Sequence, residues 1–199
     1  MNQKSIKADT SQQILDVAQD LVQTRGYNAF SYADISKVLK VSNASLHYHF
    51  PSKADLGNSL IARYEDRFLR ALKAIEAGGG TMTDRFWAFV GIYADVLAAD
   101  HMCLCGMLAA EFETLPQPMQ SALDHFFEAT EVWLESVLEH GRRNGEFGFY
   151  ETAREVAQFS IATLEGAMIL ARSHAAHDRF HMAAKRLIAG LMRSGPDVA

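Results

Sequence analysis

The chain has 199 residues, of which 49% are hydrophobic and 22% charged, a globular composition that excludes a disordered chain. Two Cys are too few for a disulfide scaffold, and the net charge of −5 excludes a strongly basic nucleic-acid binder. The polar start predicts no signal peptide, and the longest mostly apolar run, 86–99, is shorter than the roughly 20 residues of a membrane helix. We expect a cytoplasmic protein.

Helical periodicity runs through the whole chain without sustained strand-like alternation, which predicts an all-α fold. Four helices are expected first, at about residues 10–26, 31–39, 43–48 and 53–76, with Thr10 and Ser31 among their N-caps. The segment Ala77–Gly80 then breaks the pattern. Five further helices are expected at about residues 84–99, 102–114, 119–144, 152–174 and 179–193, with Thr83 capping the first of them. We assign residues 1–57 to a small helical domain and residues 58–199 to a helical bundle.

Charge is divided unevenly between these parts. Residues 1–58 carry six Lys or Arg and five Asp or Glu, whereas the remainder has a net charge of −6. The first part therefore permits contact with DNA, and the acidic remainder discourages it.

The second and third helices are short, are joined by a tight turn and follow a first helix that can pack over both. This is the order of a helix-turn-helix unit, whose third helix lies in the major groove of DNA. Its polar side chains can bond base edges, its rings can contact a thymine methyl, and a Lys at the start of the fourth helix suits a phosphate. The candidate DNA-binding residues are Ser31, Lys37, Asn43, Ala44, Ser45, His47, Tyr48 and Lys53. A short polar helix at the surface, with Tyr48 in the core, is the alternative.

The stretch from Ile14 to Ile61 resembles the DNA-binding head of the TetR family of transcriptional regulators. The resemblance is carried by Gly26-Tyr27, Ser31, Ile35, Val41-Ser42 and the run LHYHFPSK, residues 46–53. It implies a homodimer that binds a palindromic operator through a helix-turn-helix domain at 1–57. It also implies repression as the default and a small-molecule inducer bound by the body. The recognition helix of the family commonly has Gly and Tyr where this chain has Ala44 and His47, which leaves Tyr48 and His47 as candidates for the usual Tyr contact.

The last two expected helices are rich in Ala, Gly and Ser, which lets helices approach closely. Packing within one chain would explain this, but the resemblance favours a four-helix interface between two chains. Aromatic and Met side chains of the body are either core or the wall of an inducer pocket. The candidate pocket residues are Phe68, Phe86, Tyr93, Cys103, Met107, Phe112, Phe126, Trp133, Phe159 and Met168. The fourth helix is expected to transmit inducer binding to the head.

Both Cys lie in the segment HMCLCG, residues 101–106. They are interpreted as small buried hydrophobes, as a thiol switch for electrophiles or oxidants, or as metal ligands with His101. The following residues, up to Met119, are similar to a TetR subgroup that includes repressors of electrophile-detoxifying genes, in which Cys103 would be the reactive thiol. A switch at Cys103 or Cys105 is therefore the alternative to a reversible inducer.

An enzyme with Cys103 as nucleophile and His101 as base lacks an orienting group and an oxyanion motif. We predict no catalytic residues, no metal and no cofactor, and a regulator instead of an enzyme.

Overall fold

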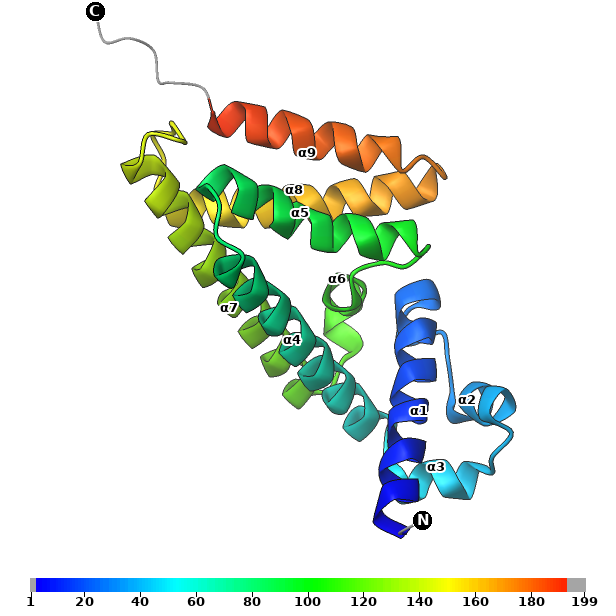
Figure 1. The fold of residues 1–199 in the computed structure, drawn as a ribbon. Coiled ribbons are helices and arrows are strands. Elements are labelled where there is room, and N and C mark those ends of the chain that lie inside the picture. The colour runs from blue at the N-terminus through cyan, green and yellow to red at the C-terminus, as the bar shows by residue number, and fades with distance from the viewer. Residues whose placement is uncertain (1–2, 193–199) are drawn as a thin grey trace, which may run out of the picture. The chain divides into compact units, whose positions relative to one another are not determined.

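The computed structural model describes residues 3–192, with side chains from Thr10 onward, and this part of the chain contains helices and no strand (Figure 1). The all-α prediction is confirmed. The helices are α1 (Gln3–Arg25), α2 (Tyr32–Leu39), α3 (Asn43–His49), α4 (Lys53–Ala77), α5 (Met82–Ala98), α6 (Leu104–Ala109), the 3-10 helix η1 (Phe112–Thr114), α7 (Gln117–Arg143), α8 (Ala153–Ser173) and α9 (Asp178–Leu191).

Three expected boundaries are wrong. Thr10 lies inside α1, because the residues before it contain no Gly or Pro to stop the helix. Thr81, not Thr83, caps α5, since the Thr81 hydroxyl accepts from the amide of Asp84 at 3.0 Å while the Asp84 carboxylate accepts from the amide of Thr81. The expected helix at 102–114 is divided into α6 and η1. The expected end of the last helix at residue 193 lies outside the described residues.

The chain packs as two compact units that each combine separate stretches of sequence. Unit 1 contains the chain up to Asp66 together with Cys103–His125, and unit 2 contains Arg67–Met102 and the chain from Phe126 onward. The chain passes from one unit to the other within α4, before α6 and within α7. The domain boundary between residues 57 and 58 stays a prediction.

In unit 1, the apolar face of α1 packs against α2 and α6, and α2 packs against α3. Ile14, Ala18 and Val22 recur at every fourth position of α1 and are fully buried. Ile35 of α2 and Leu46 of α3 are also fully buried. The buried faces therefore fix which sides of the two short helices remain in solvent.

In unit 2, α8 and α9 pack along each other and both contact α5, as their neighbouring ribbons in Figure 1 show. Arg154 near the start of α8 forms ion pairs with Glu128, Glu131 and Glu135 of α7. No helix in the described part of the chain combines the length and apolar character needed to cross a membrane.

Candidate nucleic-acid interface

The start of α2 is held by a capping box at Ser31. The backbone amide and the hydroxyl of Ser31 donate to the Asp34 carboxylate at 2.7 and 2.8 Å. The hydroxyl and amide hydrogen bonds hold the pKa of the Asp34 carboxyl below its ordinary value. Ser31 is exposed, and Lys37 lies exposed in the last turn of the same helix.

The turn between α2 and α3 contains Lys40 in the left-handed region, with φ of 56°. The Val41 amide closes this turn by donating to the Ser36 carbonyl at 3.3 Å. Ser42 then caps α3 by accepting from the Ser45 amide at 3.2 Å, and the Ser36 hydroxyl donates to the amide oxygen of Asn43. These local bonds set the angle at which α3 leaves α2.

One face of α3 is presented to solvent. Asn43, Ala44, His47 and Tyr48 lie at positions that share a helix face, and all four are exposed, whereas Leu46 on the other side is buried. Tyr48 has 68% of its surface exposed and packs edge-on against the His49 ring at 5.4 Å. An exposed aromatic residue beside an amide side chain is suited to base and phosphate contacts.

His47 is directed back toward the protein. Its Nδ1 lies 3.1 Å from the Pro51 carbonyl, which can only accept, so Nδ1 carries the hydrogen of this bond. Its ring lies 4.7 Å from the ring of Tyr32, whose hydroxyl donates to the Phe50 carbonyl at 2.7 Å. Of the two candidates for the family's Tyr contact, Tyr48 is therefore the better placed.

Lys53, at the start of α4, is half-buried. Its ammonium donates to the carbonyls of Tyr27 and Phe30 and lies 4.5 and 4.3 Å from the centroids of their rings. Burial lowers the pKa of Lys53, and the charges of Glu111 and Asp34 oppose this effect. The phosphate contact stays a prediction, and the geometry favours a role in holding the loop between α1 and α2.

Seven of the ten candidate pocket residues lie in unit 2, and several of them meet in one aromatic cluster. The Phe68 ring of α4 lies 5.1 Å from Phe126 of α7 and 6.3 Å from Tyr93 of α5. The Phe89 ring connects Phe86 and Trp133 to this cluster, with its centroid 6.4 Å from that of Phe86 and 5.6 Å from that of Trp133. Met168 is fully buried on α8.

The other three candidates, Cys103, Met107 and Phe112, lie in unit 1 around α6. Phe89 lies in this aromatic cluster but is not among the candidate pocket residues predicted from the sequence. The spacing of Phe86, Phe89 and Tyr93 along one helix face is the signal that could have found it.

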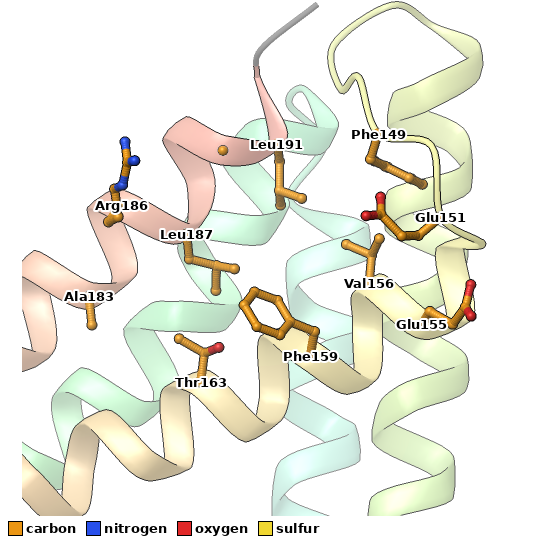
Figure 2. A pocket seen from close by; sticks show the side chains of 11 residues that line it. Phe149, Glu151, Glu155, Val156, Phe159, Thr163, Ala183, Arg186, Leu187 and Leu191 are labelled. Carbon is orange, nitrogen blue, oxygen red and sulfur yellow. The ribbon is translucent and has the colours of Figure 1, made fainter. Parts of the chain in front are cut away.

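A pocket of about 740 Å³ lies on the surface of α8 and α9 (Figure 2). Phe159 is the one candidate pocket residue that lines it, together with Val156, Thr163 and Leu187 among others. The charged residues Glu151, Glu155 and Arg186 also line it, and Figure 2 shows Glu151 beside Phe149.

The same two helices expose large apolar side chains. Phe159 is 63% exposed on α8, where Gly166, Ile169 and Leu170 continue its helix face, and Met182 is exposed on α9. Exposed apolar side chains gathered on one face mark an interaction surface.

Cys103 is the N-cap of α6 and is buried, with 2% of its surface exposed. Its Sγ accepts from the Gly106 amide at 3.5 Å and from the Tyr64 hydroxyl at 3.7 Å. Cys105 is fully buried in α6, and neither Cys forms a disulfide. Across residues 3–192 no group of three His, Cys, Asp or Glu is arranged to hold a metal ion.

Two family models match the chain. Residues 14–60 match the bacterial regulatory proteins of the tetR family, and residues 83–187 match the tetracyclin repressor-like C-terminal domain. The second match alone covers more than half of the chain.

Individual relatives agree with these models. The transcriptional repressor NemR of Escherichia coli is 27% identical over 176 residues, spanning 85% of this chain and 87% of NemR. The crystal structure of a TetR-family regulator from Agrobacterium tumefaciens superposes on this chain with a TM-score of 0.91. The two sequences are 33% identical, and the match covers 94% of this chain and 100% of that one. The reduced form of Escherichia coli NemR superposes with a TM-score of 0.78 at 25% identity over 95% of this chain and 100% of that one. The chain belongs to the TetR family and is a DNA-binding transcriptional regulator, not an enzyme.

Proposed function

We propose that this regulator is a repressor that binds a palindromic DNA operator as a homodimer and is released by a small-molecule inducer. The observation that carries the proposal is the exposed face of α3 with Asn43, Ala44 and Tyr48, held by the Ser42 cap at its start and followed by the Ser52–Asp55 cap in the next turn. Relatives described as repressors support the direction of regulation.

We assign the contacts to DNA from the solvent exposure of the side chains on α2 and α3. Asn43 and Tyr48 would face base edges, with Ala44 against the floor of the groove, while Ser45 lies half-buried behind them. Ser31 and Lys37 would contact phosphates from α2. His47 would position α3 from the surface through the Pro51 carbonyl, and the half-buried Lys53 would do so through the loop between α1 and α2.

A second copy of the chain is the partner proposed for the apolar face of α8 and α9. Phe159, Ile169 and Met182 would be covered by the same face of the partner, since a two-fold axis pairs each patch with itself. Two recognition helices would then reach half-sites about 34 Å apart, one turn of DNA.

Selection of bound duplexes from a random pool tests the proposal. We expect an enriched palindrome whose half-sites are about one helical turn, ~10 base pairs, apart. Asn43→Ala should enrich a different sequence, whereas Lys37→Ala should keep the sequence and bind more weakly. An enriched site without two-fold symmetry would contradict the homodimer.

The inducer site is proposed at the aromatic cluster of Phe68, Tyr93, Phe126 and Trp133, which joins α4, α5 and α7. The Trp133 Nε1 donates to Glu76 of α4 at 2.9 Å, so its fluorescence reports on this junction. Trp87, the other Trp, is partly exposed, and Trp87→Phe isolates the Trp133 signal. A small molecule that changes this signal should also release DNA, and release should be lost in Phe126→Ala.

A thiol switch is the second candidate, favoured by the two donors on the Cys103 sulfur, because N–H and O–H groups directed at sulfur stabilise a thiolate. The description of a NemR structure as reduced is in keeping with such a switch. N-ethylmaleimide should then release DNA from the wild type and Cys105→Ser but not from Cys103→Ser. Equal release from all three proteins would exclude a switch at Cys103.

A further inference from the structure

The loop between α1 and α2, residues 26–31, is held from two sides within unit 1. On one side the Lys53 ammonium binds the carbonyls of Tyr27 and Phe30. On the other side the segment that follows α6 binds Asn28. The loop leads directly into Ser31, the N-cap of α2, so its placement sets the start of the helix-turn-helix pair.

The second side is a closed set of three hydrogen bonds. The Glu111 carboxylate accepts from the backbone amide of Asn28 at 3.1 Å, and the Asn28 side-chain amide donates to the Thr114 hydroxyl at 2.7 Å. The Thr114 hydroxyl in turn donates to the Glu111 carbonyl at 2.7 Å. Both the backbone and the side chain of Asn28 are therefore held by residues more than 80 positions away in sequence.

Gly26 allows the Glu111 carboxylate to come this close. Its φ of +98° suits Gly, and a Cβ at this position would lie 2.6 Å from the nearer Glu111 oxygen. The carboxylate thus lies against the end of α1 as well as the loop.

Charge reinforces the arrangement. Glu111 and Lys53 approach the same loop with opposite charges, and the negative charge of Glu111 counteracts the lowering of the Lys53 pKa by burial. Burial raises the pKa of Tyr27 to about 12, and Glu111 adds to this effect.

We propose that Glu111, with Thr114, is a positioning residue for DNA binding, which holds the 26–31 loop and thereby the placement of α2 and α3. This inference rests on the proposed reading of DNA by α3. Since the segment directly follows α6, it also connects α6 to the loop that precedes α2.

The test compares Glu111→Ala and Thr114→Val with Thr114→Ser, which keeps the hydroxyl, and with Glu113→Gln, an exposed neighbour that loses the same charge. On the duplex selected by the wild type, we expect Glu111→Ala to weaken binding about tenfold, the loss typical of one charged hydrogen bond. Affinity for an unrelated duplex should stay near wild type. Thr114→Ser and Glu113→Gln should bind like the wild type.

Amide hydrogen exchange of the free protein is a second test of the positioning role, and it needs no operator DNA. Glu111→Ala should speed exchange at Asn28 and through α2 and α3, while exchange in α8 stays unchanged. Unchanged exchange in the loop, or an equal loss of affinity for the selected and unrelated duplexes together with a lower unfolding midpoint, would overturn the positioning role. If the wild type selects no duplex but Glu111→Ala shows the expected faster exchange, the proposed function is contradicted and the positioning role of Glu111 is not.

Discussion

Lys53 illustrates how one side chain can serve the fold at a position where sequence suggests a ligand contact. A Lys at a helix start next to a recognition helix has the charge for a phosphate. In the structure its ammonium binds two backbone carbonyls and lies over two aromatic rings. Removing it would leave those carbonyls without their donor, which costs more than the loss of a surface charge.

Lys53→Met is expected to lower the free energy of unfolding by about 1–3 kcal/mol, because the Tyr27 and Phe30 carbonyls lose a charged donor. The salt dependence of DNA binding should keep its slope. Lys37→Met should show the reverse, with unchanged stability and a slope reduced by about one unit, as expected for one lost phosphate contact. Urea unfolding and salt titration of binding measure both quantities. If Lys53→Met instead reduced the slope of the salt dependence and left the free energy of unfolding unchanged, Lys53 would be assigned to a phosphate contact.

The direction of Lys53 could not be predicted from the sequence, because the carbonyls it binds are more than 20 residues away. The same holds for Asn28 and Glu111, whose pairing joins segments far apart in the chain. The exposed face of α3 was predictable, since Leu46 marks the buried side and the remaining residues follow by helical spacing.

At the scale of elements, four of the described helices begin with the same carboxylate cap, at Asp34, Asp55, Asp84 and Glu155, and three of these carboxyls have a lowered pKa. Asp34, Asp84 and Glu155 each bind the backbone amide and the hydroxyl of the residue three positions earlier. These hydrogen bonds lower the pKa of all three carboxyls.

Because each folded-state pKa is lowered, the stabilisation is present above the ordinary carboxyl pKa of about 4 and is lost as the pH falls through the folded value. The triple variant Asp34→Asn, Asp84→Asn and Glu155→Gln should therefore lose less stability than the wild type between neutral pH and pH 3. Thermal unfolding across this range measures the difference. Parallel curves for the two proteins would show that the caps do not contribute to the acid response.

The turn between α8 and α9 holds a residue other than Gly in the left-handed conformation, which is unfavourable. Ala175 has φ of 49°, and the amides of Ala175 and Ala176 donate to the carbonyls of Arg172 and Ala171. This hydrogen-bond pattern usually has Gly at the left-handed position, since a Cβ is unfavourable there.

Ala175→Gly should raise the free energy of unfolding by up to about 1 kcal/mol, because the left-handed strain is removed. Ala176→Gly is the matched control and should lower stability, since it only frees the unfolded chain. Denaturant unfolding of the two variants compares them directly. An equal loss in both would contradict strain at Ala175.

Most helix positions could be predicted because their caps and breaks are local signals, as at Ser31 and at Gly78–Gly80. The division of the expected 102–114 helix could not, because the helical pattern of residues continues through it. Contacts of Glu111 and Thr114 with Asn28 accompany this break, and such contacts between distant segments leave no local signature.

At the scale of the whole molecule, the chain passes between the two units three times. The fourth helix was expected to transmit inducer binding, and α4 does belong to both units. The passages before α6 and within α7 add two further covalent routes, of which the first enters unit 1 at Cys103.

The face of α8 and α9 gives the prediction that belongs to this scale. Phe159→Glu should convert the protein from two chains to one at micromolar concentration, because a carboxylate on a covered apolar face loses its hydration. Val132→Glu on α7, where Val132 is 52% exposed, is the matched control and should remain a dimer. Sedimentation velocity distinguishes the two masses. If both variants remained dimers, the interface between the two chains would not contain Phe159.

In the proposed function, a two-fold dimer binds both halves of one operator. The most direct measurement is the mass of the complex on the selected duplex, compared with a duplex that carries a single half-site. We expect two chains on the full duplex and binding to the half-site that is weaker by about 100-fold or more, since the contacts of one recognition helix are lost. One chain per duplex, bound equally well by the half-site, would contradict it.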